Sequence, residues 1–377
     1  MNDRIAIVGA GIVGACLAYR LARSGQAVLM IDDGRPGRAT GWNPGGINPL
    51  HGPGFPGPMQ AIYRDAYRIH AEQRGQVRGA SGIDFGWRVV DRLFLALDQR
   101  EAEELRASAD RYNAFGDGFS GRWMDADAIA RWDQRVGSSW VGGLMTRGNV
   151  RVDAERYRLA LLAAATRLGA EVVTACVQSV ETTHGRIASV DWGDGRVGVS
   201  ALCMATGAFN DIAGWSPGTL IDVVPAIGDL LLVRSMGSPP LADISRGLTA
   251  IYQHDRDYFW IGGTTRAGGP LGESSADIER QLLDGAKSLI PGWAAPNVVA
   301  RASAARPSTA DGLPVVGRAP NYENGWIVNG LGGKGILLSA WAADTVARMI
   351  AGDAEVADVE PVSPNRTIEE TWQKITV

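Results

Sequence analysis

The chain has 377 residues, of which 45% are hydrophobic and 21% are charged, and its formal net charge is −4 at pH 7. These values exclude a largely disordered chain, and the negative net charge argues against a nucleic-acid partner. The length predicts two or three domains. Glycine is abundant, with 49 residues and no Gly-X-Y period. The excess therefore predicts tight turns and places where the backbone approaches a ligand closely.

The cysteines and the apolar segments bear on the cellular compartment and on whether disulfides or a metal site are expected. Cys16, Cys176 and Cys203 lie far apart in apolar runs, so we expect buried free thiols, no disulfide framework and no metal site. No segment has the roughly 20 consecutive apolar residues of a membrane span. The sequence thus predicts a cytoplasmic protein without a membrane span. It leaves open contact with a membrane surface and assembly into a homo-oligomer.

The first 32 residues have the pattern of a nucleotide-binding unit. A β-branched run, residues 4–8, predicts a buried parallel strand, and a helical pattern and a second apolar strand follow. Between them stand Gly9, Gly11 and Gly14, which would allow a tight turn, a close approach to a pyrophosphate and close helix packing. Asp32 ends the second strand, where a carboxylate can accept hydrogen bonds from ribose hydroxyls. This pattern predicts a bound dinucleotide, NAD or FAD, and the acid disfavours NADP.

The segment after this unit favours FAD over NAD. Residues 41–50 form a glycine- and proline-rich loop, which extends to Pro58 and precedes a helical pattern from Met59 to about Gln73. A purely NAD-binding domain would continue here with another strand and helix. Gly45 and Gly46 would instead let the backbone approach a flat ring or a phosphate.

At this point the chain resembles the D-amino-acid oxidase superfamily of FAD-dependent oxidoreductases, which includes glycine oxidase, sarcosine oxidase and D-amino-acid dehydrogenase. The opening glycine motif with its acid and the Gly-Gly-Ile-Asn-Pro loop carry the resemblance first. Later segments carry it further: residues 152–173, 201–208, 258–265, 305–317 and 329–338. The resemblance therefore spans nearly the whole chain.

The resemblance implies a set of cofactor contacts on matching positions. It implies FAD contacts at Gly9, Gly11, Ile12, Val13, Gly14, Asp32, Asp33, Gly45, Gly46, Ile47, Val177, Ala205, Thr206, Gly207, Arg306, Gly332, Gly333, Lys334, Gly335 and Ile336. Val177 would meet the adenine from a strand. The glycine turn at 332–335, before a long apolar helix, would meet the pyrimidine side of the flavin. No cysteine lies at 306–335, where some sarcosine oxidases attach the flavin, so non-covalent FAD is expected.

The resemblance also implies an α/β fold, in which a Rossmann-like FAD-binding domain is interleaved with a mostly antiparallel α+β substrate domain. The FAD-binding domain is predicted at 1–82, 149–224 and 302–365, and the substrate domain at 83–148 and 225–301. Strands expected at 229–233, 249–252 and 258–263 would cover the reactive ring. The polar tail after Ala354 is predicted to be peripheral.

The implied reaction is oxidation of a C–N bond in a small amine or amino acid, such as a D-amino acid, glycine, or an N-methyl or cyclic amino acid. Hydride would pass to flavin N5, and the electrons would then pass to oxygen or another acceptor. Arg306 is the predicted catalytic-site arginine, because a guanidinium binds a carboxylate through two hydrogen bonds, unless a salt bridge to Asp311 occupies it. Tyr252 is a second candidate. Lys334 could lie near the flavin.

Other readings of these residues stay open. The fold also hosts dehydrogenases of 2-hydroxy acids or polyols, and a non-catalytic flavin-binding subunit of a larger complex is a further alternative. The histidines, His51, His70, His184 and His254, are expected in surface or loop positions. Trp42 and Asn43 replace the small hydroxyl residues usual before the Gly-Gly pair. The 12 tryptophans leave room for a bulky, apolar pocket.

Overall fold

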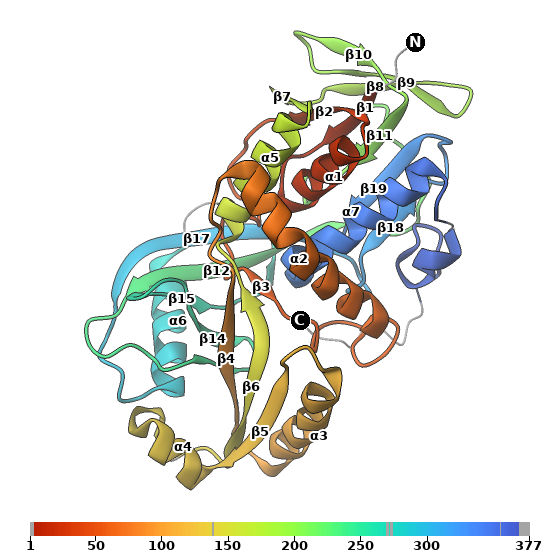
Figure 1. Ribbon diagram of the computed structural model, residues 1–377. Helices are drawn as coiled ribbons and strands as arrows, with labels where there is room; N and C mark the ends of the chain where they lie inside the picture. Colours follow the sequence, from red (N-terminus) through yellow and green to blue (C-terminus); the bar gives the residue numbers. More distant parts are fainter. Residues whose placement is uncertain (1–3, 138, 269–270, 272–273, 355, 369–377) are drawn as a thin grey trace.

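The computed structural model describes residues 4–137, 139–268, 271, 274–354 and 356–368. The described chain contains a six-stranded and a ten-stranded sheet, which lie in the upper and lower halves of Figure 1. Segments far apart in the sequence contribute to each sheet. This arrangement confirms the predicted α/β fold with two interleaved parts. The exact domain boundaries stay a prediction.

The six-stranded sheet is built around the first strand of the chain. In spatial order it contains β18 (Val315–Arg318), β19 (Gly325–Asn329), β11 (Ala201–Met204), β1 (Arg4–Val8), β2 (Ala27–Asp32) and β7 (Glu171–Thr174). Its pairs are parallel except for β18 with β19. The central strands are almost wholly apolar because both faces of the sheet are covered.

Helices cover one face of this sheet and a small sheet covers the other. The helices are α1 (Ile12–Arg23), α2 (Gln60–Ser81), α5 (Ala154–Arg167) and α7 (Gly335–Ala351), and Figure 1 shows them side by side. The small sheet contains β8 (Ser179–Thr183), β9 (Arg186–Asp191) and β10 (Arg196–Gly198). In the described part of the chain, no helix combines the length and the apolar character that a membrane crossing requires.

The ten-stranded sheet forms the second part of the molecule. Its main path runs through β16 (Arg266–Ala267), β12 (Val224–Arg234), β15 (Tyr258–Gly262), β14 (Thr249–Gln253), β13 (Asp243–Arg246), β4 (Arg88–Ala96), β6 (Gly142–Arg151) and β3 (Gly46–Ile47), while β17 (Asn297–Ser308) pairs with β12 and β5 (Ser120–Asp125) with β6. Among these pairs, only β13 with β4 is parallel. The mostly antiparallel character was predicted.

Helices and short 3₁₀ segments complete the two parts. Around the ten-stranded sheet stand α3 (Gln99–Phe115), α4 (Ala126–Trp132), α6 (Ala276–Leu289) and the 3₁₀ segment η1 (Gln134–Val136). The 3₁₀ segments η2 (Gly332–Lys334) and η3 (Val356–Val362) lie before and after α7. The strand β3 joins the glycine-rich loop to the larger sheet by pairing with β6.

The structure corrects several local predictions. Helix α2 continues past the expected end near Gln73 to Ser81, because Val77 is fully buried and the left-handed stop comes only at Gly82. The tail is not merely peripheral, since Val359 and Val362 are buried against the helical layer. Val177 lies between β7 and β8, outside any strand.

Cysteine and histidine burial also differs from expectation. Cys16 and Cys203 are buried, as predicted, but Cys176 is exposed. His51, His184 and His254 lie in loops or turns, as expected, whereas His70 is fully buried within α2. His70 is enclosed because its ring fills the contact between α2 and α7, where backbone carbonyls of α7 satisfy it.

Candidate functional site

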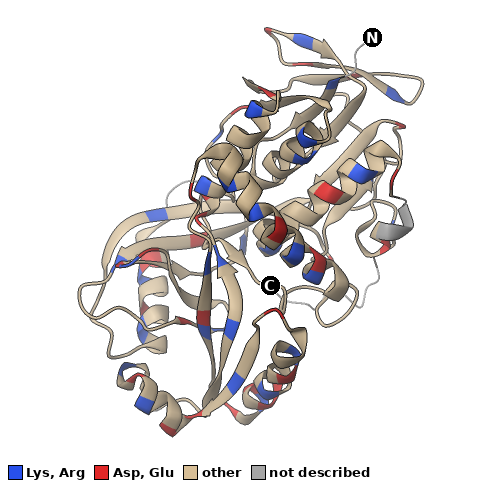
Figure 2. Cartoon of the chain, in the orientation of Figure 1, with Lys and Arg blue, Asp and Glu red and all other residues tan. Residues whose placement is uncertain are grey.

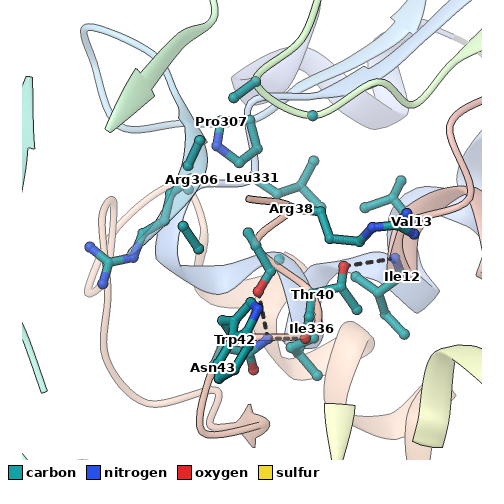
Figure 3. A pocket seen from close by; sticks show the side chains of 18 of the residues that line it. Ile12, Val13, Arg38, Thr40, Trp42, Asn43, Arg306, Pro307, Leu331 and Ile336 are labelled. Carbon is teal, nitrogen blue, oxygen red and sulfur yellow. Dashed lines mark hydrogen bonds between the residues drawn. The ribbon is translucent and has the colours of Figure 1, made fainter. Parts of the chain in front are cut away.

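The turn between β1 and α1 requires glycine for steric reasons. Gly9 has φ +101°, and a Cβ there would lie 2.4 Å from the carbonyl oxygen of Ala205. A Cβ on Gly14 would lie 1.9 Å from the carbonyl oxygen of Gly9. Helix α1 begins just beyond this turn, and the Ile12 N–H donates to Thr40 Oγ1 at 3.1 Å (Figure 3). The helix N-terminus and its positive dipole thus face the space beside Gly11.

Asp32 ends β2 beside this turn. Its Oδ2 accepts a hydrogen bond from the Ala10 N–H at 2.7 Å, and its Oδ1 accepts one from the Gly34 N–H at 2.8 Å. Arg38 pairs with the same carboxylate at 3.2 Å. Asp33 instead pairs with Arg35. The chain thus holds the Asp32 carboxylate in place at the carboxyl end of a parallel strand, where nucleotide ligands bind in this class of fold.

A cavity of about 690 Å³ begins at this turn and continues to the ten-stranded sheet. Its volume is in the range of sites that enclose small-molecule ligands. Of the predicted site residues, the following line it: Gly9, Gly11, Ile12, Val13, Asp32, Asp33, Gly46, Val177, Ala205, Thr206, Gly207, Tyr252, Arg306 and Gly332 to Ile336. The structure therefore brings together residues from both ends of the chain.

Gly14, Gly45 and Ile47 are predicted site residues that do not line the cavity. Gly14 serves helix packing, as described above. Gly45 has φ +74°, and a Cβ there would lie 1.8 Å from the carbonyl oxygen of Val152. Ile47 is fully buried within β3. Gly45 and Ile47 fix the glycine-rich loop to β6 and to Val152 just after it. Contact of Gly14, Gly45 and Ile47 with a cofactor stays a prediction.

The loop before β3 is also fixed by Asn43. Its Nδ2 donates to the carbonyl oxygens of Ala39 and Thr40, and its Oδ1 accepts from the Gly45 N–H at 2.7 Å (Figure 3). Trp42 lies beside it, edge-on to Trp260 with 6.1 Å between the ring centroids. Trp42 and Asn43, which stand where small hydroxyl residues are usual, thus give a loop held by hydrogen bonds and an indole ring on the cavity wall.

Arg306 extends from β17 in the direction away from Ile12 and Val13 (Figure 3). Its Nη1 donates to the Thr264 carbonyl and to Thr265 Oγ1, each at 3.2 Å. Burial lowers its pKa from the ordinary value, but a guanidinium stays charged at neutral pH. Within the described residues no carboxylate forms an ion pair with it, and Asp311 pairs with Arg366 instead. The alternative salt bridge is therefore wrong.

Gly228 makes room for this guanidinium. A Cβ at Gly228 on the neighbouring strand β12 would lie 2.1 Å from Arg306 Nη2 and 2.3 Å from its central carbon. Gly228 and Leu230 line the cavity from alternate positions of β12, as side chains on one sheet face must. Sequence reasoning missed Gly228, because only tertiary contact reveals the space that it leaves.

Tyr252 lies on β14 between two further arginines. Its hydroxyl is 3.5 Å from Arg92 Nη2, and its ring centroid is 5.2 Å from the guanidinium carbon of Arg92 and 4.8 Å from that of Arg151. Arg151 forms a buried ion pair with Asp243. Arg92 is only 6% exposed, donates to Ser245 Oγ at 2.9 Å, and has no carboxylate at ion-pair distance among the described residues.

Lys334, at the start of α7, forms a second basic position beside Arg92. Its Nζ donates to the Asn48 carbonyl at 3.3 Å, and burial together with the charge of Arg92 lowers its pKa to about 7. His51 lies close by, and burial, then Lys334 and Arg92, hold its pKa well below the ordinary value. Within the described structure, His51 Nδ1 and Asn48 Oδ1 are buried without a hydrogen-bond partner.

Sequence reasoning missed Arg38, Asn48, Arg92 and Arg151 as cavity residues. Figure 2 shows the basic segments of β4 and β6, the strands that carry Arg92 and Arg151. A weak signal existed for Arg92, which lies two residues after Val90 and two before Phe94 and therefore shares a strand face with apolar side chains. Asn48 stands in the Gly-Gly-Ile-Asn-Pro loop that carries the resemblance, whereas no local signal marked Arg38.

The cavity suits an elongated dinucleotide with a ring at one end. The Gly9–Gly14 turn leaves no side chain where a pyrophosphate would approach, and Asp32 flanks that position. At the other end, Asn48 and His51 present unpartnered polar atoms near the glycine turn that begins α7. The residues present therefore fit FAD.

Comparison with known proteins agrees with this geometry. The family model described as FAD dependent oxidoreductase matches residues 4–349. Glycine oxidase of Pseudomonas putida is 23% identical over 380 residues, covering 97% of this chain and 99% of the relative. D-amino acid dehydrogenase of Paramagnetospirillum magneticum is 22% identical, covering 98% and 100%. The crystal structure of glycine oxidase from Geobacillus kaustophilus superposes with a TM-score of 0.89 at 24% identity, covering 97% and 100%.

Proposed function

The chain belongs to the FAD dependent oxidoreductase family, and from this premise we propose that it oxidises the C–N bond of a small, carboxylated amine or amino acid to an imine. Its cofactor is FAD, and it is an enzyme of amine or amino-acid oxidation in the broad sense. The identity of the amine, the electron acceptor and the residue roles below belong to the proposal.

The surroundings of Arg306 are the main support for a substrate with a carboxylate. Its guanidinium is buried on the cavity wall and has hydroxyl and carbonyl partners but no described acid. A buried cation without a counterion is costly, and a substrate carboxylate would remove that cost through two charge-assisted hydrogen bonds. Tyr252 lies near enough to act electrostatically on the pKa of Arg306. Its hydroxyl would donate a hydrogen bond to the same substrate carboxylate.

In the proposed reaction, bound FAD would supply the hydride acceptor, and the residues of this chain bind and orient the amine. Arg306 and Tyr252 would hold the carboxylate, so that the reacting C–H bond is fixed in direction. If the amine binds neutral, no strong base is required. His51 is kept neutral by burial and by its cationic neighbours, so it would not add a charge beside the amine. Water then hydrolyses the imine product.

Anaerobic mixing of the holoenzyme with substrate panels tests the proposal. Glycine, sarcosine, D-amino acids or cyclic amino acids should bleach the visible absorbance of the flavin, because reduction of the bound ring is read directly. Bleaching by 2-hydroxy acids or polyols alone would replace the amine by an alcohol donor. No bleaching by any class would favour a non-catalytic subunit. Repeating the active reaction with oxygen and with artificial dyes identifies the acceptor.

Arg306→Ala should lower kcat/KM for carboxylated substrates by roughly 100-fold or more, because the charge-assisted contact is lost. Arg306→Lys should recover part of this loss, since it restores the charge without the forked geometry. Both variants should retain FAD and its absorbance. Arg234→Ala, an exposed arginine at the end of β12, is the matched control. Unchanged kcat/KM in Arg306→Ala would remove Arg306 from substrate binding.

A further inference from the structure

The partners of Arg306 stand in a bulge of the ten-stranded sheet. Between β15 and β16 the four residues 262–265 lie opposite only the three residues 228–230 of β12. Such a bulge turns its backbone and side chains out of the regular ladder and is able to aim them at a site. Here the Thr264 carbonyl and the Thr265 hydroxyl accept hydrogen bonds from Arg306 Nη1, each at 3.2 Å. The direction of the guanidinium therefore depends on what holds the bulge.

Asp229 of β12 holds the bulge through Thr264. Thr264 Oγ1 donates to Asp229 Oδ2 at 2.6 Å and accepts from the Asp229 N–H at 2.9 Å. One residue thus takes the only proton of this hydroxyl and one of its lone pairs. Because the hydroxyl and the carbonyl belong to the same residue, fixing the Thr264 hydroxyl restricts where the Thr264 carbonyl points. Asp229 is therefore linked to Arg306 through a single intervening residue.

The Asp229 carboxylate is itself fixed and charged. Its side chain is fully buried, Arg266 Nε lies 3.3 Å from Oδ2, and Ser303 Oγ donates to Oδ1. Burial opposes ionisation of this carboxyl, but the hydrogen bonds from Arg266, Ser303 and Thr264 outweigh it and keep its pKa below the ordinary value. At neutral pH the carboxylate thus accepts charge-assisted hydrogen bonds, which are stronger than those between neutral groups.

Asp229 lies on the face of β12 that is turned away from the cavity. Gly228 and Leu230, on either side of it in the chain, line the cavity, and consecutive residues of a strand face opposite sides of a sheet. Arg266 forms an ion pair with Asp229, so the negative charge is compensated there. Arg306 therefore keeps its positive charge for a ligand, and any effect of Asp229 on that ligand is indirect.

We propose that Asp229 is a positioning residue for substrate binding, which acts through Thr264 to hold the Arg306 guanidinium in the direction that a substrate carboxylate requires. The inference rests on the proposed role of Arg306 and adds a residue that does not touch the substrate. A guanidinium that is already oriented loses less conformational freedom when the carboxylate binds, so the affinity is higher.

Binding of a carboxylate that does not react tests this role without turnover. In methylthioacetate sulfur replaces the amine nitrogen of sarcosine, and titration of the holoenzyme through the flavin absorbance gives its dissociation constant. Asp229→Asn and Thr264→Val should each weaken binding roughly 10-fold, as expected for one lost supporting hydrogen bond. Thr264→Ser, which keeps the hydroxyl, should stay within about twofold of the wild type, as should Asp257→Asn, at an exposed acid just before β15. Unchanged affinity in Asp229→Asn or in Thr264→Val would overturn the proposal.

Double variants separate a positioning role from a general loss of structure. Asp229→Asn combined with Thr264→Val should weaken binding about as much as either change alone, because both break the same link. In an Arg306→Ala background, Asp229→Asn should alter the dissociation constant by less than about twofold, since the residue through which it acts is gone. Losses that simply multiply in either combination would show that Asp229 acts by another route and would overturn the proposal.

Kinetics distinguishes failure of this inference from failure of the proposed function. With an amine that reduces the flavin, Asp229→Asn should raise KM roughly 10-fold and change kcat by less than about threefold, with the flavin absorbance unaltered. A fall in kcat at unchanged KM would contradict the positioning role. If Arg306→Ala weakens methylthioacetate binding and Asp229→Asn does not, only the role of Asp229 is wrong. If no amine reduces the flavin, the proposed function itself is wrong, and the titrations still decide whether Asp229 acts through Arg306.

Discussion

At the scale of single residues, the site depends on what is missing beside Arg306 as much as on the arginine itself. Gly228 has no side chain, and the guanidinium occupies the volume that a Cβ would need. The Thr264 carbonyl and the Thr265 hydroxyl then fix one edge of the fork. The other terminal nitrogen, Nη2, lies over Gly228, and both residues line the cavity. Specificity of this kind comes from a small residue and a large one on neighbouring strands.

Gly228→Ala should therefore displace the Arg306 guanidinium while the protein still folds, because the end of a long side chain can move more easily than backbone. We expect KM for a carboxylated substrate to rise roughly 10- to 100-fold, with a smaller change in thermal stability. Steady-state kinetics and a melting curve measure both. Gly75→Ala, in α2 where a Cβ meets no atom within 4 Å, is the control. Unchanged KM in Gly228→Ala would contradict the steric argument.

At the scale of elements, the contact between α2 and α7 is held by a buried polar chain. His70 Nε2 lies 2.8 and 2.9 Å from the carbonyl oxygens of Ile336 and Leu337, so Nε2 carries the proton and donates. Nδ1 accepts from the Tyr157 hydroxyl at 2.9 Å, which accepts from Gln73 at 2.8 Å. This chain positions the first turn of α7, which lines the cavity.

The same contact makes stability depend on pH. Burial lowers the pKa of His70 from 6.5 to about 4, so between these values the unfolded chain binds a proton that the folded chain does not. Stability from this group is complete above pH 6.5 and is lost as the pH falls, by about 2 kcal/mol at pH 5. His70→Gln should reduce the change in melting temperature between pH 5 and pH 7. His184→Gln, at an exposed site, should leave that change as it is in the wild type. Parallel profiles for wild type and His70→Gln would refute this assignment.

At the scale of the whole molecule, the cavity lies where the six-stranded and ten-stranded sheets meet (Figure 1). The nucleotide turn belongs to the first sheet, Arg306 and Tyr252 belong to the second, and the loop through β3 joins them. A ligand that spans this cavity contacts both parts. Its binding therefore stabilises the packing of one part against the other.

Removal of FAD should lower the melting temperature, because a ligand that binds only the folded state stabilises it by about 4 kcal/mol at a thousandfold excess over Kd. Differential scanning calorimetry of the apoprotein, with and without added FAD, measures the shift. NAD and FMN serve as controls, since the first lacks the isoalloxazine ring and the second lacks the adenosine half. Recovery with NAD as complete as with FAD would contradict the predicted cofactor geometry.

The sequence by itself determined the nucleotide-binding unit, the cofactor class and the interleaved fold. Strand, glycine turn, helix and acid are adjacent in the chain, and each position is constrained by local backbone geometry. Arg306 was found because it stands in a motif with a recognisable pattern. The sequence did not show that Arg306 forms no ion pair with Asp311, because Asp311 pairs with Arg366, which lies far along the chain.

Only the tertiary structure decided which further residues share the cavity. Arg92, His51 and Lys334 come from three separate segments, and nothing local links them. Burial depends on how strands and helices pack, so the complete burial of His70 could not be read from its neighbours in the sequence. Local spacing fixes turns and strands, whereas long-range packing fixes which charges meet and which remain without a partner.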